Sequence, residues 1–288
     1  ERLLPPRVFY RLCPELYTAG RTASGVPVYL QLLGGQPQVL AENAARAAEL
    51  GIPGVDLNFG CPAKTVNRSD GGSIILRQPE RVHALVAAVR AAIPEGVPVT
   101  VKIRLGYEEH SRFLETVAGI EAAGASELTI HARTKKHGYR PPAYWEEIAR
   151  AREIVSLPII ANGEIWSPAD ALRCQQVTGC SDLMLGRGAL CRPDLARLVR
   201  AAVDGKQLKP LCWDAIPPLL LQFFELNLAH YDAGHAGNPL KQWLVYLRSY
   251  YPQAAVLFES VKRLRKPEDI AAVLQRAVER SAARLQAA

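Results

Sequence analysis

The chain repeats one hydrophobic pattern from about residue 27 onward: a short apolar run rich in β-branched residues, then an alanine-rich amphipathic stretch. Each apolar run ends in glycine or a polar residue. Apolar strands that alternate with amphipathic helices are typical of a parallel sheet covered by helices. The predicted strands lie within 28–34, 55–60, 99–106, 128–133, 159–163 and 183–188, and the predicted helices near 38–50, 79–92, 111–123, 145–154, 168–177 and 193–203.

Polar side chains lie at the C-terminal end of every predicted strand. This favours a closed (β/α)8 barrel, an α/β fold of the TIM-barrel type, because a barrel collects such residues in a ring. An open doubly wound sheet concentrates them at one switch point. No G-x-G-x-x-G motif follows an early strand, as a Rossmann domain requires. The strand-end residues are Gln31, Asn58, Lys102, His131, Asn162 and Arg187.

Such a barrel needs eight strands, and only six runs are visible. Residues 1–20 show no strand pattern, so we expect two strands to precede Glu1. The barrel domain is predicted over 1–203, with 204–213 as a polar linker that contains Pro210.

Residues 214–288 show only helical periodicity, broken at 234–239, Pro252 and Pro267. This pattern predicts a bundle of about four helices. Basic residues cluster there and could form a contact surface for a polyanion or an ordinary solvated face. The cluster contains Lys241 and Arg248, seven residues apart, and the run Lys262, Arg263, Arg265 and Lys266.

Composition and charge narrow the class of protein. Of 288 residues, 49% are hydrophobic and 22% charged, which is typical of a globular protein. The net charge of +7 suits a polyanionic partner without proving one. No apolar run is long enough for a membrane span, and no leader pattern is present. Six cysteines without C-x-x-C or zinc-ligand spacing indicate reduced thiols in a cytoplasmic protein without a metal site.

The segment Asp56-Leu-Asn-Phe-Gly-Cys-Pro62 carries the strongest chemical signal. The strand ends at Asn58, and Gly60 and Pro62 hold Cys61 in a turn at the strand's C-terminal rim. Barrel enzymes place catalytic groups there. The alternative is a buried, inert thiol, but a turn between Gly and Pro is a poor position for core packing.

Lys102 lies inside an apolar strand pattern, where its ammonium group needs an anionic or polar partner. A reduced flavin carries such charge near N1 and O2, although a structural carboxylate would also serve. His131 ends the next strand and could be a ligand contact or a structural group. The cations after it indicate a phosphate-rich substrate. They are Arg133, Lys135, Lys136 and Arg140.

The last two predicted strands end in Ala161-Asn-Gly-Glu164 and Leu185-Gly-Arg-Gly-Ala189. Glycines let backbone N–H groups approach an anion, and Arg187 adds a forked donor. In this class of barrel the loops after strands seven and eight form the usual phosphate site. The absence of H-E-x-x-H, G-x-S-x-G and Walker A motifs argues against hydrolases and nucleoside triphosphatases.

These motifs, in this order, resemble the tRNA-dihydrouridine synthases along the whole chain. Lys64-Thr-Val-Asn67, Gly138-Tyr-Arg140 and Lys241-Gln-Trp-Leu-x-Tyr-Leu-Arg248 are most similar to the bacterial C-type enzymes, which are associated with uridine 16 in the D-loop. The resemblance implies a barrel that holds FMN, NADPH as the reductant, a helical domain that grips tRNA, and a monomeric protein. One departure is that the family's first strand motif, Ala-Pro-Met-x-Gly, is absent from this sequence.

Carried over residue by residue, Cys61 matches the family's proton donor, and Asn58, Arg104 and Tyr139 would approach the target base. The tRNA-facing cations would be those of the 133–140 loop and of the helical region. Two rival functions stay open: a flavin barrel that reduces a free pyrimidine or an enone, and a non-catalytic tRNA-binding factor. The positions that match FMN contacts are Gln31, Lys102, His131, Asn162, Gly163, Glu164, Gly186 and Arg187.

Overall fold

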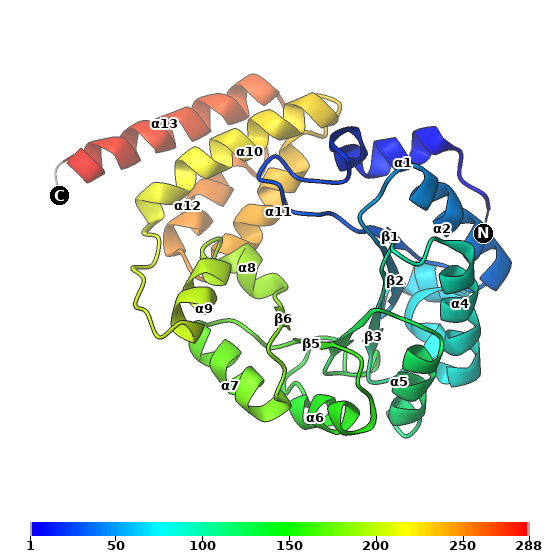
Figure 1. Cartoon of the computed structure of the whole chain (residues 1–288). Coiled ribbons are helices and arrows are strands. Elements are labelled where there is room, and N and C mark those ends of the chain that lie inside the picture. Colours follow the sequence, from blue (N-terminus) through cyan, green and yellow to red (C-terminus); the bar gives the residue numbers. More distant parts are fainter. Residues whose placement is uncertain (1, 287–288) are drawn as a thin grey trace. The chain divides into compact units, whose positions relative to one another are not determined.

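A computed structural model describes residues 2–286, and contains the six parallel strands that the hydrophobic pattern predicts. Residues 1, 287 and 288, which the predicted domains include, lie outside the described residues. The strands follow one another in chain order across a single sheet (Figure 1). They are β1 (Leu30–Leu32), β2 (Val55–Phe59), β3 (Val99–Arg104), β4 (Glu127–His131), β5 (Ile159–Asn162) and β6 (Leu183–Met184).

The predicted helices follow the strands. Pro is the first residue of many of them, which its fixed φ and missing N–H group favour. The α-helices of this region are α1 (Pro6–Leu12), α2 (Pro37–Glu49), α3 (Lys64–Arg68), α4 (Pro79–Ala92), α5 (Phe113–Ala122), α6 (Trp145–Ile154), α7 (Pro168–Thr178), α8 (Arg187–Cys191) and α9 (Leu195–Val203), with the 3-10 helices η1 (Pro14–Thr18) and η2 (Gly72–Arg77).

The end of the sixth predicted strand differs from the sequence pattern. We expected a strand over 183–188, but β6 contains only Leu183 and Met184, and helix α8 already begins at Arg187. A Cβ atom at Gly188 would lie 2.3 Å from the carbonyl oxygen of Ile165, so glycine permits this close approach. The G-R-G motif therefore forms a strand-to-helix turn.

The residues described divide into two compact units, residues 2–164 with 173–184, and residues 165–172 with 185–286. The second unit thus takes in residues ahead of the expected linker at 204–213. The expected domain boundaries stay a prediction.

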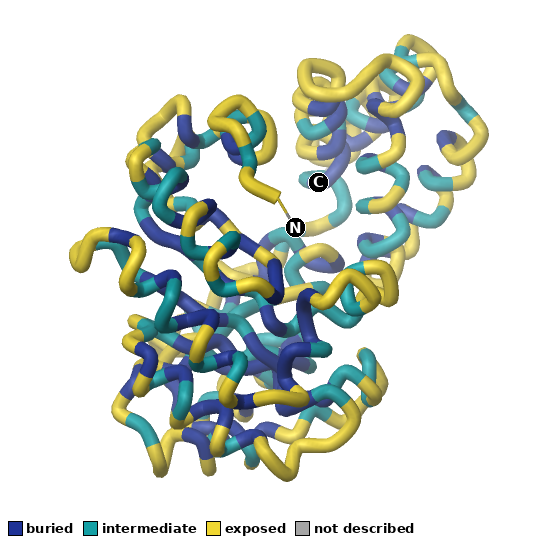
Figure 2. Tube along the Cα trace, turned by 90° about the vertical axis from the view of Figure 1, so that its right-hand side faces the viewer, coloured by how far each residue is buried: buried dark blue, intermediate teal, exposed yellow. Residues whose placement is uncertain are grey.

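In the first unit the sheet has one apolar and one polar face. Val55, Leu57 and Phe59 are completely buried, as are Val99 and Val101, because side chains of one parity point toward the covering helices. Helices α2, α4 and α5 lie on this side of the strands (Figure 1). Buried residues concentrate in the interior along the strands, and exposed residues lie mostly in the outer turns (Figure 2). The alternate, polar side chains of the strands point to the opposite face of the sheet.

The second unit contains η3 (Trp213–Ala215) and the helices α10 (Ile216–His230), α11 (Gly237–Leu247), α12 (Pro252–Val261) and α13 (Pro267–Gln286). Leu240, Leu244 and Leu247 recur at helical spacing on α11 and enter a shared core with Phe224 and Leu274. Within residues 2–286 no helix is both long and apolar enough to cross a lipid bilayer.

Candidate active site

Strand register brings the predicted polar residues into rows across the sheet. Asn58 is paired with Lys102, and Lys102 with Thr129. One step nearer the strand ends, Arg104 is paired with His131, and His131 with Asn162. Since neighbouring parallel strands keep the same parity, these side chains share one face. The structure therefore gathers residues that lie more than a hundred positions apart in the sequence, such as Asn58 and Asn162.

The row nearest the start of the strands contains a carboxylate that the motif search did not single out. Asp56 accepts hydrogen bonds from Gln31 Nε2 (2.6 Å) and Thr100 Oγ1 (2.7 Å). Asn58 Nδ2 donates to Gln31 Oε1 over 2.9 Å, which links the two rows. Asp56 and Asn58 are two positions apart in β2, so their side chains point to the same polar face, and this spacing could have identified Asp56 from the sequence.

Cys61 lies in a turn whose backbone is tightly held. Its carbonyl oxygen accepts hydrogen bonds from Asn67 Nδ2 (2.9 Å), Ser73 Oγ (2.9 Å) and the Ser73 N–H group (3.1 Å). Gly72 has φ +68°, and a Cβ atom there would lie 2.8 Å from the same oxygen. The thiol itself is free and half-buried. Sequence reasoning found Cys61 but missed Asn67 and Ser73, which lie outside the strand pattern.

Lys102 carries a cation in a largely enclosed part of the polar face. Its Nζ donates to Asn162 Oδ1 over 3.1 Å, and Asn162 Nδ2 donates to the Met184 carbonyl over 2.7 Å. The pKa of Lys102 is lowered to about 8, chiefly by burial and in addition by the nearby Arg104, while Asp56 opposes the change. A partner that carries negative charge would stabilise the ammonium form.

Arg104, a predicted contact of the target base, is bonded to the loops on both sides of it. We expected it to approach the target base, but its side chain is only 2% exposed. Its guanidinium donates to three backbone carbonyl oxygens, those of Gly60 (2.8 Å), Thr134 (3.2 Å) and Gly138 (3.0 Å). Burial lowers the pKa of Arg104, and Tyr139, whose ring centroid lies 5.3 Å from the guanidinium carbon, opposes this. Arg104 thus joins the Cys61 turn to the loop after β4.

Arg133, which we expected on a tRNA-facing surface, has its partners inside the protein. The side chain is fully buried. It forms an ion pair with Glu164 and donates to the carbonyl oxygens of Arg140 (2.8 Å) and Pro142 (3.1 Å). A buried guanidinium with these partners is unavailable to phosphate. The residues next to Arg133 in the sequence do not indicate that it is buried, because its burial depends on the packing of three segments.

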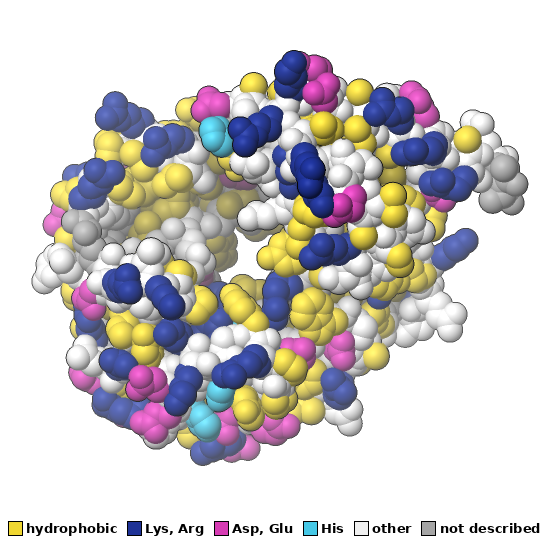
Figure 3. Space-filling view, turned by 180° about the vertical axis from the view of Figure 1, so that it is seen from behind, with side chains coloured by type: hydrophobic (Ala, Val, Ile, Leu, Met, Phe, Trp, Pro, Cys, Tyr) yellow, Lys and Arg dark blue, Asp and Glu magenta, His cyan; other side chains and the backbone are white. Residues whose placement is uncertain are grey.

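The other cations of the 133–140 loop lie nearer the surface. Lys136 and Arg140 are exposed and Lys135 is half-buried, and Tyr139 is 51% exposed. Lys135 Nζ lies 4.6 Å from the centroid of the Tyr107 ring. On the face drawn in Figure 3, Lys and Arg side chains alternate with Asp and Glu rather than forming one basic patch.

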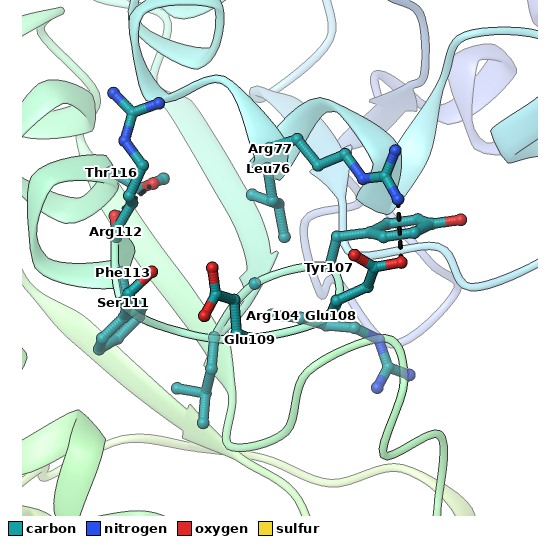
Figure 4. Close-up of a pocket in the computed structure, with 12 residues that line it drawn as sticks. Leu76, Arg77, Arg104, Tyr107, Glu108, Glu109, Ser111, Arg112, Phe113 and Thr116 are labelled. Atoms are coloured by element: carbon teal, nitrogen blue, oxygen red, sulfur yellow. Dashed lines mark hydrogen bonds and ion pairs between the residues drawn. The ribbon is translucent and has the colours of Figure 1, made fainter.

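A pocket next to this loop contains further charged groups. Arg77 stacks over Tyr107 at 4.3 Å and pairs with Glu108 over 3.0 Å, as Figure 4 shows. Arg104 and residues at the start of α5, Phe113 and Thr116, also line this pocket. Because Arg77 is neutralised by Glu108, we do not add it to the candidate phosphate contacts.

In the second unit, Arg187 begins α8, directly after Gly186. The guanidinium of Arg187 lies 5.0 Å from the centroid of the Trp166 ring. Sequence reasoning missed Trp166, which follows β5 by four residues. Gly186 has no atom within 4 Å of a Cβ built on it, so the backbone at this position is open to an approaching group.

In the helical region, the predicted basic residues differ in exposure. Lys241 was expected on a tRNA-facing helix side, but it is half-buried, and its Nζ donates to the Leu264 carbonyl oxygen over 2.6 Å. Leu264 lies in the connection between α12 and α13, among the basic run. Arg248, Lys262, Arg263, Arg265 and Lys266 are all exposed, and Lys262 is paired with Glu259. Lys241 therefore holds the segment that carries the exposed cations.

Comparison of the sequence with known proteins shows the family to which the chain belongs. The model of the dihydrouridine synthase (Dus) family matches residues 3–282. A tRNA-dihydrouridine(16) synthase of Pseudomonas syringae pv. tomato is 48% identical over 91% of this chain and 83% of its own length. Proteins of the same name from Pseudomonas putida and Shewanella oneidensis are 49% and 48% identical, over 91% and 96% of this chain and 81% and 86% of their own lengths. The chain therefore belongs to the dihydrouridine synthase family.

Proposed function

We propose that this chain is the enzyme that reduces uridine 16 of transfer RNA to 5,6-dihydrouridine, with FMN as bound cofactor and NADPH as reductant. The names of its relatives support the position. The observation that carries the chemistry is the row of Asn58 and Lys102 across β2 and β3, beside the Cys61 turn. A cation and a neutral amide on one face, next to a thiol, suit reduction of an uncharged ring better than hydrolysis.

The donor set fits an anionic flavin ring. Within the residues that the structure describes, the hydrogen bond of Lys102 goes to a neutral amide oxygen, and burial holds its pKa at about 8. Negative charge at N1 and O2 of a reduced flavin would offset that burial. FMN, when bound, would supply the hydride. We propose that Gln31, Lys102, His131, Asn162, Gly163 and Glu164 hold its ring, and that Gly186 and Arg187 bind its phosphate.

Cys61 is proposed as the proton donor. The uracil C5–C6 double bond accepts a hydride at C6 and a proton at C5, and the thiol of Cys61 supplies that proton as general acid. Asn58 would donate to a carbonyl oxygen of the base, and Tyr139 would approach the ring from the loop after β4. Arg104 would support these residues through its hydrogen bond to the carbonyl oxygen of Gly60.

The tRNA would be gripped through its phosphates. Only the base can enter a pocket, so the uridine has to leave its stacked position. We propose Lys135, Lys136 and Arg140, together with Arg248, Lys262, Arg263 and Arg265, as phosphate contacts. Exposure of most of these cations supports this, and affinity should fall steeply with salt.

We further propose that the sheet is part of a (β/α)8 barrel, with residues 1–203 as the FMN-binding domain, 204–213 as linker and 214–288 as the helical tRNA-binding domain. The sequential parallel order of β1 to β6 supports the barrel. The protein would act as a cytoplasmic monomer.

The test is to map dihydrouridine in tRNA treated with the purified protein, FMN and NADPH. We expect dihydrouridine at position 16, and none in a transcript with cytidine at that position. Equal reduction of free uridine would favour the pyrimidine reductase. A protein that binds tRNA without any flavin spectrum would favour the non-catalytic binding factor.

A further inference from the structure

Arg133 is the centre of a buried set of hydrogen bonds that joins three segments. Its side chain lies between the end of β4, the residue after Gly163 and the far end of the 133–140 loop. In addition to its bonds with Glu164 and the two loop carbonyls, Arg133 has its Nη1 atom 3.4 Å from Nε2 of His131. Glu164 has φ +58°, a conformation that non-glycine residues adopt only when the surroundings hold it.

The contact with His131 determines which ring nitrogen carries the proton. A guanidinium is always charged and can only donate hydrogen bonds. Nε2 of His131 must therefore be the acceptor, and a neutral imidazole with its lone pair on Nε2 has its proton on Nδ1.

The protein also encloses the Nε2 edge of the ring. A Cβ atom at Gly163 would lie 3.0 Å from Cδ2 of His131 and 3.4 Å from Nε2. Gly163 is itself held, because Trp145 Nε1 donates to its carbonyl oxygen over 2.9 Å. His131 is 8% exposed, so the ring has little room to turn over.

We propose that Arg133 is a positioning residue that fixes His131 as the neutral Nδ1–H tautomer and so presents a hydrogen-bond donor to an acceptor oxygen of the flavin. The inference rests on the proposed function, in which His131 contacts FMN. The flavin carbonyl oxygens only accept hydrogen bonds, so the other tautomer would offer them a lone pair instead. Loss of such a bond corresponds to about tenfold weaker binding.

The first experiment is 15N NMR of the histidine rings in flavin-free, full-length protein, with the His131 signals assigned by comparison with His131→Gln. We expect the Nδ1–H tautomer at His131. Because this measurement uses the unaltered chain, it decides the inference even if variants of Arg133 do not fold. A proton on Nε2 in the unaltered protein would overturn it.

The second experiment measures FMN binding by fluorescence quenching in Arg133→Met and Arg133→Lys, with Arg276→Met, which removes an exposed arginine of α13, as control. We expect about tenfold weaker binding in R133M, recovery in R133K, which restores a donor, and no change in R276M. A folded R133M protein with unchanged FMN affinity would contradict the inference. Failure of the unaltered protein to bind FMN would instead count against the proposed function, whatever the tautomer.

Discussion

The guanidinium of Arg104 donates a hydrogen bond to the carbonyl oxygen of Gly60 over 2.8 Å, and Gly60 directly precedes the candidate proton donor. The same guanidinium holds Thr134 and Gly138. One buried side chain thus fixes the relative position of two loops, one with the thiol and one with the exposed aromatic ring of Tyr139.

Replacement of Arg104 by Met should destabilise the protein and loosen both loops. Three carbonyl oxygens would lose a donor, and each buried acceptor left unsatisfied costs about 1–3 kcal/mol. We expect a lower thermal midpoint and faster amide exchange in residues 60–73 and 134–140. Arg140→Met, an exposed arginine of the same loop, is the control. Unchanged exchange in both segments would show that Arg104 does not join them.

Cys61→Ala should keep FMN and tRNA binding but lose dihydrouridine formation by about 10²–10⁴-fold, the usual contribution of a positioned proton donor. The readout is single-turnover formation of dihydrouridine with pre-reduced protein. Cys212→Ala, which removes an exposed thiol elsewhere, should leave the rate unchanged. Full turnover by C61A would refute the assigned role.

Gly72→Ala tests how firmly the Cys61 backbone must be held. Alanine at a left-handed φ costs about 1–2 kcal/mol, and here the new Cβ would also lie 2.8 Å from the Cys61 carbonyl oxygen. Gly51→Ala is a matched control, since φ is +78° there and no atom lies within 4 Å. Chemical denaturation should show a larger loss for G72A than for G51A. Equal losses of stability in the two variants would show that the Cys61 turn can move away from the new Cβ atom without further loss of stability.

Lys102 should make both stability and flavin binding depend on pH, in opposite directions. Because folding lowers the pKa of Lys102 from 10.5 to about 8, the unfolded chain holds this proton more tightly between those values. The free energy of unfolding of the flavin-free protein, relative to Lys102→Met, should therefore rise above pH 8. FMN affinity should fall above pH 8, because the ammonium charge is lost.

The control for Lys102 is Lys136→Met, which removes an exposed lysine. Neither pH dependence should change in that variant. A flat stability difference between the unaltered protein and K102M from pH 7 to 10 would contradict the perturbed titration.

The basic run and Lys241 should affect tRNA binding in different ways. Replacing Arg263, Arg265 and Lys266 by Gln should reduce the slope of log affinity against log salt by about 0.7–0.9 for each phosphate that the variant no longer neutralises, with stability unchanged. Lys241→Met should lower the thermal midpoint, since it removes the bond to the Leu264 carbonyl, and leave the slope near its original value. A large slope change in K241M would restore Lys241 as a residue that binds phosphate directly.

The sequence by itself determined the repeating strand and helix order, because hydrophobic period and proline positions are local properties. It also located Cys61 and Lys102, since a thiol between Gly and Pro and a lysine in an apolar run each conflict with simple core packing. It did not predict that α8 begins at Arg187, because a Gly-Arg sequence is compatible both with a continuing strand and with the start of a helix.

Only the tertiary structure decided which cations are available to a ligand. Arg133 was grouped with Lys136 and Arg140 as a cation of one loop, and Arg104 was expected at the target base, but Arg104 and Arg133 are buried and bonded to backbone carbonyls of other segments. Strand register and loop packing produce those contacts, and neither is encoded near the arginine itself. A charged residue's role therefore depends on which distant carbonyl or carboxylate the fold brings beside it.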